Sequence, residues 1–146
     1  MEEKEKIIEG DFLLDINDEK EIYVIESLKN KKRPVENQMR VYIKPLSGKD
    51  LAQIASLIRK DITTFQKEHP EDTRDFMELY NMFSEKWEFV YRIEKLENFK
   101  YKKDNEEHEI TDPLTLYTFA NSKLATIVGE LRLKFMQMDM INVKNL

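Results

Sequence analysis

The sequence predicts an α+β domain in which a small antiparallel sheet of three or four strands is followed by a bundle of three main α-helices. Apolar residues alternate with polar ones between residues 7 and 46, as in half-buried strands. From residue 47 onward they recur at steps of three and four, as on one face of a helix. A length of 146 residues suits one hydrophobic core, so we expect a single domain over residues 1–146.

Three segments in the strand region have the alternation typical of strands. The first is residues 12–16, and the second is residues 21–27, which are rich in β-branched and aromatic side chains. In the second segment Ile22 and Val24 are expected on one face of the sheet and the residues next to them on the other. The third segment, residues 39–46, resumes the alternation until a proline ends it.

A basic loop separates the second and third of these strands. It lacks periodic apolar residues and contains Pro34, which cannot donate to a central strand ladder. We expect a long, exposed hairpin loop whose charges are candidate contacts for a partner. Its basic residues are Lys29, Lys31, Lys32 and Arg33.

The helical region begins with a clear start signal at Ser47. The Ser47 hydroxyl can accept from an amide of the first helical turn, and Asp50 stands where a capping box needs an acidic group. We expect this first helix to stop before Pro70, because a residue that precedes proline is disfavoured in helical conformation. Its apolar face is predicted to comprise Leu51, Ile54, Ala55, Ile58, Ile62 and Phe65.

The second helix is predicted to be capped by Thr73 and to run to about Leu96, with Trp87 in the core. The strongly charged segment after it, at about residues 98–112, is interpreted as a mobile loop. Its acidic row lacks the ligand spacing of a calcium loop.

Asp112 and Pro113 then start a third helix, as cap and first helical residue, which continues to about Met138. Gly129 lies within it and marks a place where a neighbouring helix could approach closely. Three methionines near its end, at steps of two, cannot all share one helical face. We therefore expect an exposed apolar end that contacts a partner or a second copy. These candidate contacts are Met136, Met138 and Met140.

No arrangement of residues typical of an active site occurs in the sequence. Cysteine is absent, neither glycine-rich phosphate-binding pattern is present, and His69 and His108 lack metal-ligand spacing. We expect no enzymatic activity, no cofactor and no metal site. The acidic amino terminus, the net charge of −5 and the lack of a long apolar run favour a cytoplasmic protein that does not enter a membrane.

The junction between the strands and the first helix, RVYIKPLSGKDL at residues 40–51, resembles a pattern found in tail assembly chaperones of long-tailed bacteriophages. The matching residues are Lys44, Pro45, Leu46, Ser47, Asp50 and Leu51. The resemblance implies a non-enzymatic assembly factor that self-associates and keeps a helical tape-measure protein soluble. In a phage-infected cell it would act in the host cytoplasm. It supplies no catalytic residues.

Two other functions remain open from the sequence. One is a structural virion component, such as a connector or a tail-completion subunit, which would share a small sheet followed by helices. The other is a nucleic-acid-binding accessory protein that uses the basic loop from Lys29 to Arg33. The shortness of this cluster and its lack of interleaved aromatic residues favour a protein partner over nucleic acid.

Overall fold

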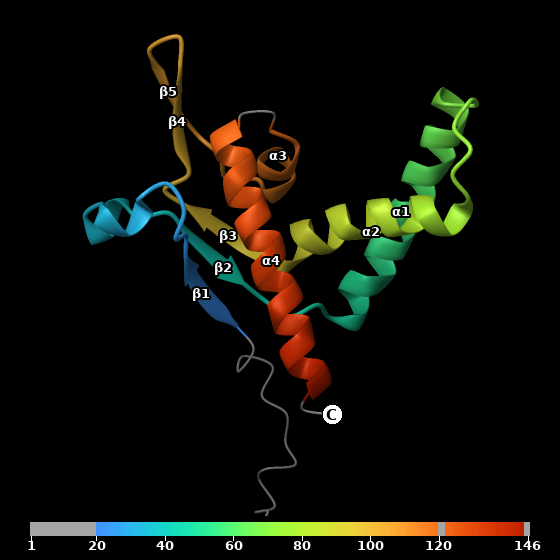
Figure 1. Ribbon diagram of the computed structural model, residues 1–146, viewed down its shortest axis with the longest axis horizontal. Coiled ribbons are helices and arrows are strands. Elements are labelled where there is room, and N and C mark those ends of the chain that lie inside the picture. The colour runs from blue at the N-terminus through green and yellow to red at the C-terminus, as the bar shows by residue number, and fades with distance from the viewer. Residues whose placement is uncertain (1–19, 120–121, 145–146) are drawn as a thin grey trace, which may run out of the picture.

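The computed structural model describes residues 20–119 and 122–144, with side chains for 20–119 and 123–139. A three-stranded antiparallel sheet lies in the order β1-β2-β3, and the long helix α4 crosses one of its faces (Figure 1). The α+β class is thereby confirmed. The strands are β1 (Glu21–Val24), β2 (Arg40–Ile43) and β3 (Ile93–Glu97).

The alternation in β1 and β2 gives the two faces that the sequence predicts. Ile22 is 57% exposed on the outer face, whereas Ile25 and Val41 are fully buried beneath α4. The predicted strand at residues 12–16, and a fourth at residues 7 and 8, lie outside the described residues.

The third strand of the sheet comes from a segment that was predicted as helix. The expectation that the second helix continues to about Leu96 is wrong, because the helix ends at Arg92 and β3 begins at Ile93. Ile93 pairs with Ile43 of β2, and the Lys44 amide donates to the Arg92 carbonyl (2.8 Å). Pairing with β2 therefore overrides the local helical spacing.

The loop between β1 and β2 folds into two 3-10 turns, η2 (Asn30–Lys32) and η3 (Val35–Asn37). Its anchor is Asn30, which is fully buried. The Asn30 amide group donates to the carbonyls of Ile25 and Met39 (2.8 and 3.1 Å), and its carbonyl oxygen accepts from the Met39 amide. This loop is therefore exposed on the outside but fixed at its base.

Helices α1 (Gly48–Glu68) and α2 (Phe76–Arg92) pack against each other and cross beside the sheet (Figure 1). The capping box of Ser47 and Asp50 is present, and α1 ends before Pro70, as predicted. The cap of α2 is Asp75 rather than Thr73, since the Asp75 carboxylate accepts from the Glu78 amide (2.9 Å). An aspartate directly before the first turn can reach this amide, whereas Thr73 lies two residues farther from the helix.

The charged segment at residues 98–112 is a hairpin for most of its length, not a loop. Strands β4 (Lys100–Lys103) and β5 (Glu106–Glu109) pair with lysines opposite glutamates, and the hairpin projects from the body of the molecule (Figure 1). Asp104 and Asn105 both have positive φ angles (53° and 66°), as the tight turn of a two-residue hairpin requires.

The predicted third helix is divided into α3 (Pro113–Thr118) and α4 (Ser122–Lys144). Asp112 and Pro113 start α3 as predicted, and Phe119 then adopts an extended conformation and packs against the core. The close helix contact expected at Gly129 is not found among the described residues, because a Cβ atom there would meet open space.

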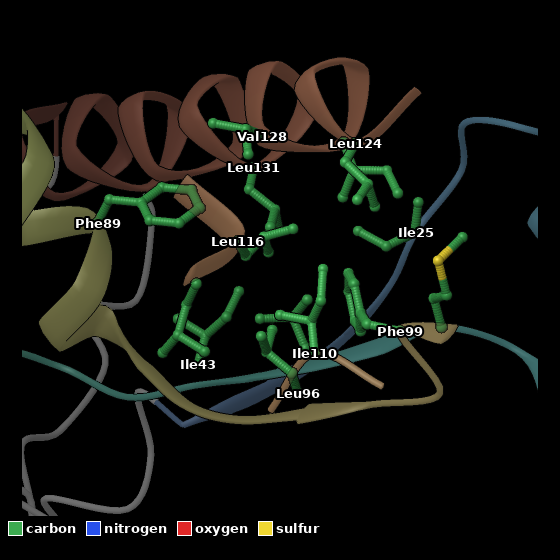
Figure 2. Close-up of a cluster of buried hydrophobic side chains, with 14 of the residues drawn as sticks. Ile25, Ile43, Phe89, Leu96, Phe99, Ile110, Leu116, Leu124, Val128 and Leu131 are labelled. Carbon is green, nitrogen blue, oxygen red and sulfur yellow. The ribbon is translucent and has the colours of Figure 1, made fainter. Parts of the chain in front are cut away.

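Two apolar clusters lie on either side of α2. The larger lies between α4 and the sheet, with Leu131, Leu116 and Phe89 among its buried side chains (Figure 2). The smaller lies between α1 and α2 and centres on Ile54, Ile58, Ile62 and Leu79. Trp87 packs against this smaller cluster and is only half-buried, so its predicted core position is confirmed in part.

Candidate functional site

The four basic residues of the predicted loop are all exposed, but they do not act as one group. Lys31 forms an ion pair with Glu26 (3.1 Å), and Lys29 occupies a left-handed turn before η2. Arg33 differs from the others because its side chain lines a cavity of about 400 Å³. The structure therefore selects Arg33 from the cluster as part of a concave site.

This cavity lies where the 28–39 loop, β4 and the beginning of α4 meet. Its floor is apolar, and four cationic side chains surround it; we call it the basic cavity. The apolar lining residues are Leu28, Met39, Tyr101, Phe119, Leu124 and Ile127. The cationic ones are Arg33, Lys100, Lys102 and Lys123.

The charges of Arg33, Lys100 and Lys102 in the basic cavity are poorly compensated within the described part of the chain. Among the described residues, no carboxylate lies within 4 Å of the charged groups of Arg33, Lys100 or Lys102. Glu107 and Glu109 lie opposite the two lysines in the β4–β5 ladder, which moderates the local field. The amino-terminal end of α4 adds the positive end of a helix dipole.

Glu130 of α4 holds the loop side of the cavity in place. Its carboxylate accepts from the Tyr23 hydroxyl (2.7 Å), from the amides of Glu26 and Ser27 (2.7 and 2.8 Å) and from the Ser27 hydroxyl. Burial by itself raises the pKa of Glu130, but these hydrogen bonds outweigh it and hold the pKa below its ordinary value. The ionised carboxylate therefore fixes the chain after β1 against α4.

The hairpin side of the cavity is held by an amide and by aromatic contacts. The Asn98 side chain donates to the carbonyls of Glu36 and Gln38 (both 2.9 Å), which ties the loop to the base of the hairpin. The Tyr101 ring lies edge-on to Phe119, at 5.0 Å between centroids, and stacks on His108. These contacts form the walls of the basic cavity before any ligand binds.

The structure describes the side chains of two of the three methionines predicted as partner contacts, and these two differ in exposure. Met136 is 58% exposed, whereas Met138 is partly buried and packs against the larger core cluster. Met136 and Met138 therefore do not share one helical face, as their spacing predicts, and their contact with a partner stays a prediction. The side chain of Met140 lies outside the described residues.

Met136 lines a second groove between α2 and α4, but the charges in that groove neutralise one another. Arg132 pairs with Glu85, and Arg92 pairs with Asp139 (2.8 Å) across the helices. Burial raises the pKa of Glu88 beside them. With its cations already paired, this groove is a weaker candidate site than the basic cavity.

The histidines have local roles in the structure. His69 lies 3.4 Å from Glu71 in the turn after α1, and His108 stacks on Tyr101. Within residues 20–119 and 123–139, no group of three His, Cys, Asp or Glu side chains is placed to hold a metal ion. None of the helices in the described part of the chain combines the length and apolar character needed to cross a bilayer.

Sequence reasoning missed most of the basic cavity because it assigned residues 98–112 to a loop. The signal that could have revealed it is the order of charges: a Lys-rich run, a two-residue Asp104-Asn105 turn and a Glu-rich run, which is typical of a hairpin. No sequence signal indicates that Arg33 lies beside this hairpin and α4.

Comparisons with family models, curated proteins and solved structures find no match to this chain. The function is therefore inferred from the basic cavity itself.

Proposed function

We propose that this protein is a non-enzymatic protein-interaction protein that binds an acidic, partly apolar segment of a partner in the basic cavity. The supporting observation is the combination of an apolar floor with Arg33, Lys100 and Lys102, for which the described part of the chain offers no ion-pair partner. Apolar side chains of the partner would leave water on this floor, and its carboxylates would pair with the surrounding cations. A client segment of that chemistry fits this site better than a small neutral molecule does.

The sharpest form of the proposal is a tail assembly chaperone of a long-tailed phage or prophage, with a helical tape-measure protein as client. The junction at residues 40–51 supports it through the resemblance described above. Such a chaperone acts in the host cytoplasm and self-associates. A connector or tail-completion subunit with the same site would instead be found in purified particles.

Co-expression with a candidate helical tape-measure protein tests this function. We expect more soluble client in the presence of this chain, and a loss of that gain when Arg33, Lys100 and Lys102 are all changed to Glu. The control is the same reversal at three exposed cations of α1, which should keep the gain. These control residues are Arg59, Lys60 and Lys67.

Two outcomes contradict the proposal. If the client is no more soluble with this chain than without it, the chaperone function is wrong. If the gain persists in the cavity variant, the protein binds its client elsewhere.

Nucleic-acid binding is a second candidate, favoured by one observation. The structure places Tyr101 and Phe119 among the cations of the basic cavity, which supplies the aromatic surface that the sequence cluster lacks. Anisotropy of a labelled single-stranded oligonucleotide at two salt concentrations tests it. Binding through these cations should weaken steeply as salt rises, and an absence of binding at low salt eliminates this candidate.

A further inference from the structure

The negative charge of the chain is concentrated at its amino-terminal end. Residues 1–19 contain eight acidic and two basic residues, a net charge of −6, whereas the whole chain has −5. Residues 20–146 therefore have a net charge of +1. Residues 20–146 are nearly neutral, and residues 1–19 account for the acidity of the chain.

The same segment is also rich in apolar side chains. Its composition, with carboxylates close to aliphatic and aromatic groups, matches the composition of the basic cavity with opposite charge. The apolar residues are Ile7, Ile8, Phe12, Leu13, Leu14 and Ile16.

We propose that residues 1–19 bind in the basic cavity of the same molecule and compete there with the partner. This inference rests on the proposed function, because it assigns a regulatory occupant to the same site. The carboxylates of the segment would pair with Arg33, Lys100 and Lys102, and its apolar side chains would cover the floor. A partner segment must displace it to bind.

The length of the segment permits this binding. The chain from Lys20 to Leu28, at the edge of the cavity, spans at most roughly 30 Å, and residues 1–19 can span roughly 65 Å. About half of the segment is enough to return along β1, which leaves the other half for the cavity. A tethered occupant acts at an effective concentration of about millimolar, so even weak contacts give substantial occupancy.

The electrostatic part of this binding predicts sensitivity to salt. Exposed charges interact over a screening length of about 10 Å at 0.1 M salt and only about 3 Å at 1 M. High salt should therefore release the segment from the basic cavity, because the apolar contacts alone should not be strong enough to hold it there.

A nitroxide label on the full-length chain tests the proposal directly. Because the sequence has no cysteine, Gly10→Cys provides a single labelling site and leaves all acidic residues of the segment in place. We expect amide signals of Met39, Lys102 and Leu124 to be lost at low salt in a ¹⁵N spectrum and to return on reduction of the label or at high salt. Signals of Arg59 and Lys60 on α1 should be retained.

Two further samples define the outcome. The first of these samples is the labelled chain with a triple reversal to Glu: reversal of Arg33, Lys100 and Lys102 should restore the cavity signals, whereas the control reversal of Arg59, Lys60 and Lys67 should not. The second sample separates binding within one molecule from binding between two. A mixture of labelled ¹⁴N protein with unlabelled ¹⁵N protein should show no loss. Undiminished cavity signals in the labelled chain would overturn the proposal, and so would a loss in the mixture, since the occupant would then belong to a second copy.

Competition is measured separately with the tape-measure client. Changing Glu2, Glu3, Glu5 and Glu9 to Gln should strengthen client binding several-fold, because the internal competitor is weakened. Client binding could be unchanged although the nitroxide label still removes the amide signals of the cavity. In that case the segment does not compete with the client, and the regulatory inference fails. The client could also fail to bind both the wild type and the Gln variant, although the label removes the amide signals of the cavity. In that case the proposed function fails, but the contact between residues 1–19 and the cavity is retained.

Discussion

The sheet with α4 and the α1–α2 pair are held together in different ways. The first draws its core from segments far apart in the sequence, including β2, α3 and α4, and it encloses several fully buried side chains. The second is formed by two neighbouring helices around a smaller cluster, with several half-buried aromatic residues at its boundary. The contrast teaches that this protein relies on long-range packing to build its site and on local helix pairing elsewhere.

Helix α2 connects the two regions. Leu79, near its beginning, belongs to the smaller cluster, whereas Phe89, near its end, belongs to the larger one. Phe89 lies edge-on to Phe135 of α4, at 5.6 Å between ring centroids. The two regions are therefore coupled through the last turns of α2. The unfolding free energies of single variants can measure how strong this coupling is.

The largest effect is expected from removing a fully buried aliphatic side chain. Leu131→Ala should lower the free energy of unfolding by about 4 kcal/mol, and Ile58→Ala by about 2 kcal/mol, because the half-buried neighbours of Ile58 can close over the space. Urea unfolding measures both. Hydrogen exchange should show that Ile58→Ala exposes mainly α1. Equal losses in the two variants would show that the regions are packed alike.

The polar contacts give the next largest effect. Glu130→Ala leaves two backbone amides and a phenol without their acceptor and should cost about 2 kcal/mol. Asp61→Ala, which removes the acceptor of the Trp87 indole and the partner of Lys86, should cost about 1 kcal/mol, since it leaves one neutral donor, rather than three, without an acceptor. A larger loss of unfolding free energy in Asp61→Ala than in Glu130→Ala would contradict the view that polar contacts matter more in the region of the sheet and α4.

The effect of Glu130 should also depend on pH in a known direction. Its pKa is lower in the folded protein than the ordinary value of 4.5, so its contribution to stability is present above pH 4.5 and is lost as pH falls through the folded pKa. The difference in unfolding free energy between wild type and Glu130→Ala should therefore shrink on acidification below pH 4.5. A difference that stays constant down to pH 2 would show that the carboxylate charge is not what holds the loop.

A smaller effect is expected at the start of the α1–α2 pair. Ser47→Ala removes one half of the capping box with Asp50 and should cost about 1 kcal/mol. Thermal unfolding followed by circular dichroism measures the loss, and Ser47→Asp, which restores a cap, should recover most of it. If Ser47→Asp is as unstable as Ser47→Ala, the cap is not the cause.

The smallest effect is expected from neutralising the cations of the basic cavity. Changing Arg33, Lys100 and Lys102 to Gln should change the unfolding free energy by no more than about 0.5 kcal/mol, because these exposed groups form no ion pair within the described residues and Gln places no like charge opposite Glu107 or Glu109. Urea unfolding of the variant and of its α1 control measures this. A large loss would mean that the cations stabilise the fold rather than serve a ligand.

Much of the fold could be predicted from the sequence because its signals are local. The alternation around Val41, the capping box at Ser47 and the Asp112-Pro113 start are each confirmed. The predictions fail where pairing with a segment far away in the sequence determines the local structure. Residues 93–97 have helical spacing but pair with β2.

Little of the candidate site could be predicted, because its residues are separated along the chain. Arg33 was singled out by the local density of positive charge, whereas Lys102 and Lys123 belong to a hairpin and a helix whose positions depend on the fold. Asn98 and Glu130 fix these elements through hydrogen bonds that span more than fifty residues.

The sequence by itself determined the α+β class, the starts of α1 and α3 and the concentration of acidic charge in residues 1–19, since periodicity, capping and composition are properties of neighbouring residues. Only the tertiary structure decided that the sheet takes its third strand from residues 93–97, that α3 and α4 are separate, and that Arg33, Lys102 and Lys123 surround one cavity. The physical reason is that burial and strand pairing are satisfied between distant segments, and they outweigh local preferences of a few tenths of a kcal/mol per residue, up to about 1 kcal/mol.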